Sequence, residues 1–326
     1  MKSTGWTKVV SAGISAAATL LVAGAVQGQA YPTKAITLIV PFPPGGVTDP
    51  FARVVGPKVT ESIGQTIIIE NKPGAAGNIA AEYVKNAKPD GYTLLMGHAG
   101  THAINTALFS KLPYDPVKDF APITNMIQTK HILVVPASSP AKTVNELVAL
   151  ARQKPLTYAS QSVGAGGHLL GEMLSNKAGI KMTHVPYKGS APAVQDTIEG
   201  RVDLFFDALI TSGPHIRSGK LRALAIASPN RASQFPDVPT MAEAGYPGVE
   251  LDFWFALYAP AGTPQPVVTK LNQEFVKAMR TDEVSKFFGN LGLDVVTTTP
   301  SELAKMGADD TVRLGKVVRD SGAKAD

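Results

Sequence analysis

The sequence predicts an α/β fold divided into two lobes. Short runs of β-branched residues alternate along the chain with stretches whose apolar residues recur at helical spacing, which is typical of βαβ units. The chain has 326 residues, of which 296 are expected to remain after removal of an N-terminal signal. This length exceeds what one compact core usually holds. The alternation and the length together predict two lobes.

The first block of elements runs to about residue 130. The apolar run at residues 36–40 predicts a buried strand. Asp49 and Pro50 then have the residue types of a helix N-cap and a first helical position, and apolar residues at helical spacing continue this helix over 51–59. The rest of the block is predicted as a strand at 66–70, a glycine-rich turn at 74–78 leading into a helix, a strand at 92–96 and a helix around Ile104.

A second block begins near His131. Thr143 and Glu146 have the spacing of a capping box and predict a helix start. A loop at 160–167 joins a strand to a helix that continues through Leu174. β-branched and aromatic runs predict the strands of this block at 132–135, 156–159, 182–185, 202–206 and 221–227.

The last block opens with an aromatic strand at 253–258. Thr263 is expected to cap a long helix with Pro264 at its first position, and a helical tail follows Pro300. A tryptophan in such a strand usually packs in a core, so we interpret Trp254 as core or lobe packing. A cleft wall for an apolar or aromatic ligand is the alternative.

The N-terminal segment has the features of a secretory signal peptide. Lys2 and Lys8 precede a long apolar run, and Gly28 and Ala30 supply the small residues that signal peptidase requires. We therefore expect cleavage near Ala30 and export from the cytoplasm. A membrane anchor is the alternative, but the run is rich in Ala and Gly and ends in small residues.

Charge and composition exclude several classes of function. Loss of Lys2 and Lys8 lowers the formal net charge from +5 to +3, and the sequence contains no basic run, so no nucleic acid partner is expected. The chain has no cysteine, which excludes disulfides, thiolate nucleophiles and cysteine-based zinc or iron–sulfur sites.

Two glycine-containing loops, at 41–49 and 160–168, are the candidate ligand sites. Each lies between a predicted strand and a predicted helix, at the strand end where open α/β sheets bind ligands. Glycine lets backbone N–H groups approach an anion, and the following helix adds a partial positive charge. One such loop from each lobe, facing a shared cleft, would hold a carboxylate without Lys or Arg. For either loop alone, an ordinary βα turn is the alternative.

Motifs for other chemistries are absent or incomplete. The glycines of 164–171 are spaced G-x-G-x-x-x-x-G rather than as a dinucleotide fingerprint, and neither a P-loop nor a G-x-S-x-G motif occurs. His98 and His102 are four residues apart, which would suit zinc on a helix, but they lack the Glu of H-E-x-x-H and Gly100 lies between them. No metal and no cofactor are expected.

Asp49 and Asp207 are the carboxylates nearest the two loops. As an acid–base pair they would need matched geometry and shifted pKa values. Asp49 is either a helix N-cap or a cleft residue, and Asp207 is either a turn former or part of a pocket wall.

Seven stretches, in order, resemble the substrate-binding proteins of tripartite tricarboxylate transporters, the Bug family. Together they span nearly the whole expected mature chain, and their combination is specific although each alone is not. They are YPTKAITLIVPFPPGGVTD at 31–49, ENKPGAAGN at 70–78, KPDGYTL at 88–94, THAIN at 101–105, HVPYKG at 184–189, GRVD at 200–203 and APAGTP at 259–264.

The resemblance implies a two-lobed type II periplasmic binding protein fold, with the ligand cleft between the lobes. After a signal peptide at 1–30, it implies a first part of lobe 1 at 31–130, lobe 2 at 131–252, and a crossover strand with the C-terminal completion of lobe 1 at 253–326. It also implies no catalysis, and a ligand held mainly by backbone amides and ordered water.

The resemblance also assigns roles by position. Phe42 would pack on the ligand, and His98, where a small residue is expected in relatives, would tune specificity. The remaining expected ligand-binding residues are Gly46, Thr48 and Asp49 in lobe 1, Gly77, Asn78 and Thr101 for further polar contacts, Ser160, Gly164, Gly166 and His168 in lobe 2, and Tyr187 and Asp207 at the cleft wall.

The expected function is that of a periplasmic, monomeric solute-binding protein. It would capture a small di- or tricarboxylate, or an aromatic carboxylate such as terephthalate, close by hinge bending, and dock on the large and small membrane subunits of a transporter. One alternative is a sensor module that presents the carboxylate to a membrane kinase. Another is an extracytoplasmic hydrolase using Asp49 or His168.

Overall fold

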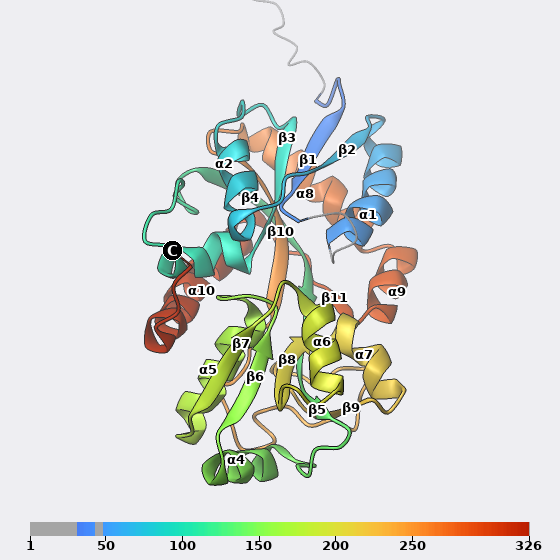
Figure 1. Cartoon of the computed structure of the whole chain (residues 1–326). Helices are drawn as coiled ribbons and strands as arrows, with labels where there is room; N and C mark the ends of the chain where they lie inside the picture. The colour runs from blue at the N-terminus through green and yellow to red at the C-terminus, as the bar shows by residue number, and fades with distance from the viewer. Residues whose placement is uncertain (1–30, 43–47, 326) are drawn as a thin grey trace, which may run out of the picture. The chain divides into compact units, whose positions relative to one another are not determined.

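Two β-sheets flanked by helices organise residues 34–325 (Figure 1). The computed structural model describes residues 31–42 and 48–325, so the expected signal peptide and Gly46 lie outside the described residues. The first sheet has the strand order β11-β4-β10-β3-β1-β2, and the second has the order β7-β6-β8-β5-β9. The predicted two-lobed α/β class is confirmed.

The first sheet is parallel at one edge and antiparallel at the other. β1 pairs in parallel with β2 and β3, whereas β10 runs antiparallel between β3 and β4, and β4 also pairs antiparallel with β11. The parallel part is the βαβ arrangement that the alternating pattern predicted. The strands are β1 (Ile36–Val40), β2 (Ile67–Asn71), β3 (Thr93–His98), β4 (Phe120–Thr129), β10 (Phe253–Pro260) and β11 (Leu293–Val295).

The second sheet repeats this plan. β6 pairs in parallel with β7 and β8, and β5 runs antiparallel between β8 and β9. The chain enters this sheet directly from β4, with Lys130 as the one residue between the strands, and returns to the first sheet at β10. The strands are β5 (His131–Pro136), β6 (Leu156–Ser160), β7 (Met182–Pro186), β8 (Leu204–Ala208) and β9 (Leu221–Ile226).

Helices cover the faces of both sheets (Figure 1). α1 and α8 pack together beside β2 and β4, while α5 and α6 pack on β6 and β8. Within the described ranges, no helix combines the length and apolarity needed to cross a bilayer. The helices are α1 (Thr48–Ile63), α2 (Asn78–Lys85), α3 (Asn105–Leu108), α4 (Val144–Gln153), α5 (Gly166–Ala178), α6 (Ser190–Ile198), α7 (Leu209–Arg217), α8 (Gln265–Met279), α9 (Asp282–Asn290) and α10 (Pro300–Ser321), with a 3₁₀ turn η1 (Ala75–Gly77) and a π-helical segment η2 (Gly100–Ile104).

Three predicted helix starts differ in detail from the structure. α1 begins at Thr48, one residue before the predicted cap at Asp49. The Thr143 side chain does cap α4, but Glu146 accepts from the N–H of Lys142 rather than of Thr143, so the capping box is not reciprocal. Thr263 does not cap α8, because its hydroxyl donates to the carbonyl of Pro260 inside the preceding turn.

Two strands were not predicted from the sequence. β4 contains Pro122, Thr124 and Asn125, which interrupt its apolar pattern, and β11 has only three residues. Both are stabilised by neighbours distant in sequence, since β4 lies between β10 and β11. Local propensity carries little information about such strands.

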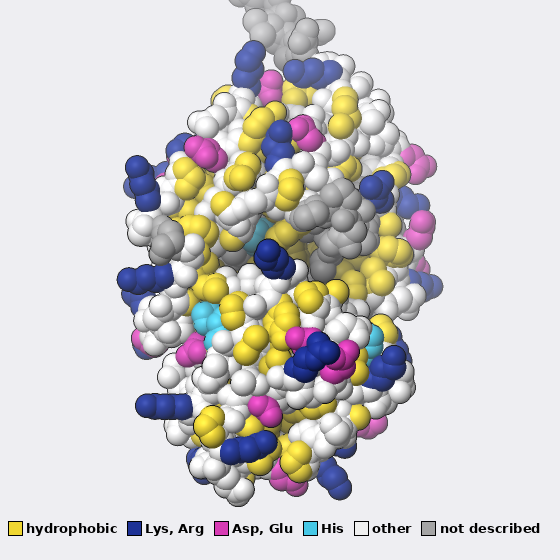
Figure 2. All heavy atoms as spheres, in the orientation of Figure 1, with side chains coloured by type: hydrophobic (Ala, Val, Ile, Leu, Met, Phe, Trp, Pro, Cys, Tyr) yellow, Lys and Arg dark blue, Asp and Glu magenta, His cyan; other side chains and the backbone are white. Residues whose placement is uncertain are grey.

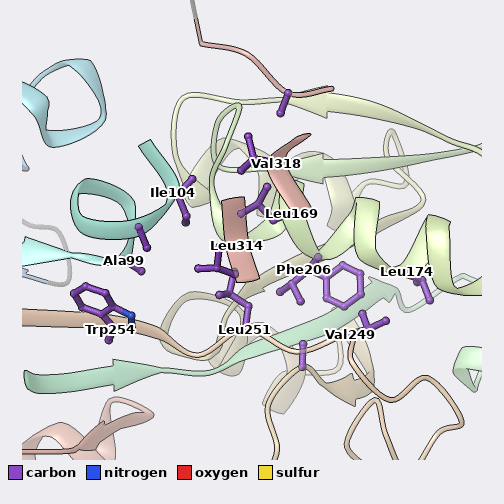
Figure 3. Close-up of a cluster of buried hydrophobic side chains, with 14 of the residues drawn as sticks. Ala99, Ile104, Leu169, Leu174, Phe206, Val249, Leu251, Trp254, Leu314 and Val318 are labelled. Carbon is purple, nitrogen blue, oxygen red and sulfur yellow. The ribbon is translucent and has the colours of Figure 1, made fainter. Parts of the chain in front are cut away.

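One hydrophobic core extends between the two sheets. Leu314 and Val318 of α10 lie near Ile104 and Leu169, as Figure 3 shows, and all four side chains are buried. Trp254 is 1% exposed in the same cluster, and its indole N–H donates to Asp310 Oδ2 at 2.8 Å. The interpretation of Trp254 as a core residue is confirmed.

Replacing Trp254 with Phe should lower the free energy of unfolding by about 2–3 kcal/mol. The substitution leaves a void and removes a donor from a buried carboxylate, and each loss is costly in a packed interior. Urea unfolding followed by circular dichroism would measure the change. Val312→Ala, at a side chain that is 73% exposed, is the matched control and should stay within about 0.5 kcal/mol of the parent protein. A loss in Trp254→Phe no larger than in this control would contradict the expectation.

Candidate functional site

A cavity of about 250 Å³ has walls contributed by elements of both sheets. A hollow near the middle of the face in Figure 2 shows a histidine and hydrophobic side chains around it. Among the described residues no Lys, Arg, Asp or Glu lines the cavity. Its described lining residues are Phe42, Ala76, His98, Gly100, Asn105, Leu108, Thr129, His131, Gln161, Ser162, Val163, Gly164, Ala165, Gly166, Ser190, Ala208, Phe253 and Phe255.

A larger hollow, of about 730 Å³, lies between α5, α10 and the segment at residues 247–250. Its wall includes exposed charged side chains such as Lys316 and Asp320, which pair with each other. None of its described lining residues belongs to the glycine-containing loops at 41–49 and 160–168. The smaller cavity is therefore the candidate site, because parallel strands end at its walls and ligands bind at that end of such sheets.

Phe42 and His98 form part of the first wall. Phe42 follows β1, and His98 is the last residue of the neighbouring strand β3, so the parallel pairing of these strands brings both rings to one edge. Their ring centroids are 5.0 Å apart. Phe253 and Phe255 of β10 lie within 5.5 Å and 6.1 Å of the same imidazole.

His98 is a neutral donor in this wall. Its Nδ1 accepts the N–H of Gly100 at 3.0 Å, so the neutral ring carries its proton on Nε2. Burial lowers the pKa of His98 to about 3. The buried Nε2 has no hydrogen-bond partner among the described residues.

His131 has the opposite tautomer to His98, with its proton on Nδ1. Its Nδ1 lies 3.3 Å from the carbonyl of Leu251, which can only accept, so the proton is on Nδ1 and Nε2 is an acceptor. Burial lowers the pKa of His131, opposed by the nearby Asp207 carboxylate. The imidazole lies directly against Gly166, where a Cβ atom would overlap it.

The loop between β6 and α5 forms the second wall. Gly164 has φ 78°, and a Cβ there would overlap Leu108 of α3, which lies in direct contact with it. α5 begins at Gly166, and its N-cap residue Ala165 offers no side-chain acceptor to the first helical N–H groups. Since Ala165 and Gly166 both line the cavity, the positive end of the α5 dipole lies at its wall.

His168 supports this loop from behind. Its Nδ1 accepts the N–H of Gly164 at 3.0 Å, and its ring stacks on His184 with centroids 3.9 Å apart. Burial lowers the pKa of each imidazole to about 4, and the pair disfavours protonation of His184 further. His168 is not among the lining residues, so in this structure it positions the loop.

Ser160 and His184 have the separation of a nucleophile and its base, 2.6 Å. Ser160 is fully buried, however, and its hydroxyl donates to the carbonyl of Ser162 at 2.9 Å. His184 Nε2 must then donate to Ser160 rather than accept its proton. The pair therefore braces the loop and does not have the polarity of an activated serine.

Asp207 is a fully buried carboxylate below the second wall. It accepts from Gln161 Nε2 at 3.2 Å and from Ser190 Oγ at 2.7 Å, and both of these residues line the cavity. Thr211 and Ser212 also donate to it. Four donors satisfy the charge and fix the orientation of Gln161 and Ser190.

Several expected ligand residues lie beside the cavity rather than on its described wall. Asn78 Oδ1 accepts from Asn105 and Tyr114, and Thr101 Oγ1 contacts His102 Nδ1 at 2.9 Å. A Cβ at Gly77 would lie 2.8 Å from His98 Nε2. Before it, Ala75 and Ala76 hold the left-handed backbone conformation, which is costly without glycine.

Tyr187, expected at the cleft wall, is not among the described lining residues. Its hydroxyl donates to Asp196 at 2.8 Å, and burial together with this bond raises the pKa of Tyr187 to about 12.

Thr48 and Asp49 begin α1, but their side chains, like all of Gly46, lie outside the described part of the structure. Of the expected ligand residues, Phe42, His98, Gly164 and Gly166 line the cavity.

The main lining residues that sequence reasoning missed are His131, Gln161, Ser190, Phe253 and Phe255. The period-2 alternation of a strand could have indicated the two phenylalanines, because Trp254 between them points into the core. Gln161 and Ser190 follow β6 and precede α6 respectively, so strand-end position was a usable signal for them.

No group of three or more metal-ligating side chains occurs within residues 31–42 and 48–325. His98 and His102 do not converge. The His98 ring contacts Phe42, whereas the His102 ring stacks on Tyr258 with centroids 3.8 Å apart.

Comparison with solved structures defines the class of protein. A structure described as a periplasmic transporter is 42% identical, with a TM-score of 0.81 over 91% of this chain and 100% of the other. A protein of R. palustris solved with adipate is 37% identical, with a TM-score of 0.82 over 90% of this chain and 99% of the other. MatC from Rhodopseudomonas palustris, solved with bound malate, is 36% identical, with a TM-score of 0.77 over 88% and 100%. The fold is that of two-lobed solute-binding receptors.

Residues 51–323 match the tripartite tricarboxylate transporter family receptor, and the chain belongs to this family. BugT of Bordetella pertussis is 36% identical over 310 residues, which cover 94% of this chain and 95% of BugT. A UPF0065 protein of a Pseudomonas species is 37% identical over 312 residues, 95% of this chain and 93% of that protein. The predicted family is confirmed.

Acid should destabilise the fold through its buried histidines. Because the folded pKa of His168 lies below 6.5, the unfolded chain binds the proton first as the pH falls. The contribution of neutral His168 is complete above about pH 6.5 and is lost as the pH falls toward 4. His168→Gln keeps an acceptor for Gly164 and removes the titration. Between about pH 7 and pH 5, the free energy of unfolding of this variant should fall by about 2 kcal/mol less than that of the parent protein, as measured by urea unfolding. An equal loss of unfolding free energy in the variant and the parent protein would contradict a contribution of neutral His168 to stability.

Proposed function

We propose that this receptor captures a small carboxylate in the periplasm and delivers it to the large and small membrane subunits of a tripartite tricarboxylate-type transporter. The observation that carries the proposal is the cavity bounded by Phe42 and His98 on one side and by the start of α5 on the other. Relatives solved with adipate and malate support a dicarboxylate or a similar acid.

The second wall suits an anion although no described cation lines the cavity. The α5 N-terminus at Gly166 brings a backbone N–H group and a partial positive charge to the wall. Gln161 holds this helix start in place, since its Nε2 donates to Asp207 and its Oε1 accepts the N–H of Gly167. Recognition by dipoles leaves the bound carboxylate partly hydrated and the complex reversible, as delivery to a transporter requires.

The size of the cavity favours a small ligand. Its volume of about 250 Å³ lies just below the range of roughly 300–1,000 Å³ typical of small-molecule sites. A mono-, di- or tricarboxylate with few heavy atoms fits this range better than a nucleotide or a peptide does.

Ligand binding would close two lobes around this cavity. In this proposal, lobe 1 comprises residues 31–130 and 253–326, and lobe 2 comprises 131–252. The strand crossing at Lys130 supplies a hinge. Gly164 of lobe 2 lies against Leu108 of lobe 1. A ligand that contacts both walls makes more contacts when the lobes are closed, and it would therefore favour the closed state.

The proposed role includes no chemical step. Ser160 and His184 lack the polarity of a nucleophile with its base, and the ligand would be released unchanged. Incubation with a bound carboxylate, followed by mass spectrometry of the released compound, separates this role from that of a hydrolase.

A carboxylate that binds should stabilise the folded protein. At about 100 times its Kd it should add about 2.7 kcal/mol, because it binds the folded state alone. Thermal-shift screening of mono-, di- and tricarboxylates, with the amide of each acid as the matched control, would measure this. The proposal fails if ligand-free protein is stabilised by none of the acids, or equally by acids and amides.

Gly166→Ala should weaken carboxylate binding at least about tenfold, since its Cβ would overlap the His131 ring and displace the start of α5. Gly289→Ala in α9 is the matched control, because its Cβ would meet nothing within 4 Å. Isothermal titration calorimetry would compare both variants with the parent protein. An unchanged Kd in a folded Gly166→Ala variant would remove this loop from the site.

A further inference from the structure

Four aromatic side chains form a continuous wall on one side of the cavity. This aromatic wall consists of Phe42, His98, Phe253 and Phe255, all of which line the cavity. Besides the contacts of His98 with the three phenylalanines, Phe253 lies 5.5 Å and Phe42 lies 6.4 Å from Phe255 between ring centroids. These separations are those of favourable aromatic pairs.

The aromatic wall keeps part of its surface open to the cavity. Phe42 and Phe253 are only half-buried, whereas His98 and Phe255 are 3% and 5% exposed. The rings are tilted by 28° to 70° with respect to one another, so they present both faces and edges. A flat ring placed against them would extend the cluster with the same stacked and edge contacts. A flexible alkyl chain would gain only burial of apolar area.

His98 gives this apolar wall one polar group. Its Nε2–H is buried beside Gly77 without a partner among the described residues, and the His98 ring lines the cavity. The proton cannot move to Nδ1, because that nitrogen already accepts from Gly100. An acceptor on the ligand would satisfy this donor, and an unpaired buried donor is unfavourable.

We propose that the cavity selects a carboxylate whose body is an aromatic ring and which carries a second hydrogen-bond acceptor opposite the first. One carboxylate would lie at the start of α5, the ring would pack on the aromatic wall, and the second acceptor would reach His98 Nε2. The inference rests on the proposed function and narrows its ligand class to aryl carboxylates with two acceptor groups.

The first test compares ligands on the unaltered protein by calorimetry. Terephthalate should bind roughly three- to tenfold more tightly than trans-cyclohexane-1,4-dicarboxylate, which has a similar length and the same charge but no aromatic face. It should also bind more tightly than adipate, an open-chain diacid. Tighter or equal binding of either saturated diacid would overturn the inference.

The second test uses variants of the aromatic wall, of which His98→Phe also removes the acceptor of the Gly100 N–H. His98→Phe keeps a ring and removes the donor, so it should weaken terephthalate binding about tenfold while benzoate, with a single acceptor group, changes less than about twofold. Phe253→Leu should narrow the preference for terephthalate over its saturated counterpart to less than about twofold.

His102→Phe is the matched control for His98→Phe. His102 is also buried, and its Nε2 has no hydrogen-bond partner among the residues described, but its ring stacks on Tyr258 and is not part of the described cavity lining. It should leave both affinities unchanged. Equal losses for terephthalate and benzoate in His98→Phe, or equal effects of the two histidine variants, would overturn the role of His98.

The ligand comparison also separates the two proposals. Binding of adipate without binding of terephthalate overturns the aromatic inference alone. Absence of binding by every carboxylate overturns the proposed function as well. Because this comparison uses the unaltered chain, it tests the preference for an aromatic ligand even where a variant does not fold.

Discussion

Close contact between glycine backbone and imidazole rings is the constraint on which the candidate site depends. Gly166 lies against His131 and Gly100 lies against His98, and a Cβ atom at either glycine would overlap the ring. These contacts bring the start of α5 to one wall and an aromatic cluster to the other. Because interiors are close-packed, neither loop can move away without opening a void.

The polar groups around the cavity are organised in layers. Asp207 orients Gln161 and Ser190, and His168 holds the N–H of Gly164, so groups behind the wall fix those on it. Within the described part of the chain, His98 Nε2 is a buried donor on a lining residue without a hydrogen-bond partner. Because most buried polar groups find a partner, a ligand acceptor at this donor would complete the hydrogen bonding of the wall.

Sequence periodicity predicted most of the fold. The strands predicted at residues 36–40 and 156–159 have strong local patterns and form as β1 and β6, and the helix predicted after the loop at 160–167 forms as α5, which already begins at Gly166. β4 was missed because Pro122 and Asn125 interrupt its pattern, and its position between β10 and β11 overrides that local signal. Thr263 has the residue type of a cap but bonds to Pro260 instead.

For the site, the sequence by itself determined which loops follow strands, and Phe42, Gly164 and Gly166 lie on the cavity as those loops indicated. It also determined the family, because ordered motifs along the chain carry that information. Only the tertiary structure decided that His131 and Phe253, far from both loops in sequence, line the same cavity, His131 beside the start of α5 and Phe253 in the aromatic wall. It also decided that His168 and Asp207 lie behind the wall formed by the loop between β6 and α5. The physical reason is that strand pairing and sheet packing bring residues together that are distant in sequence. The tautomers of His98 and His131 are likewise fixed by hydrogen-bond partners that only the folded chain supplies.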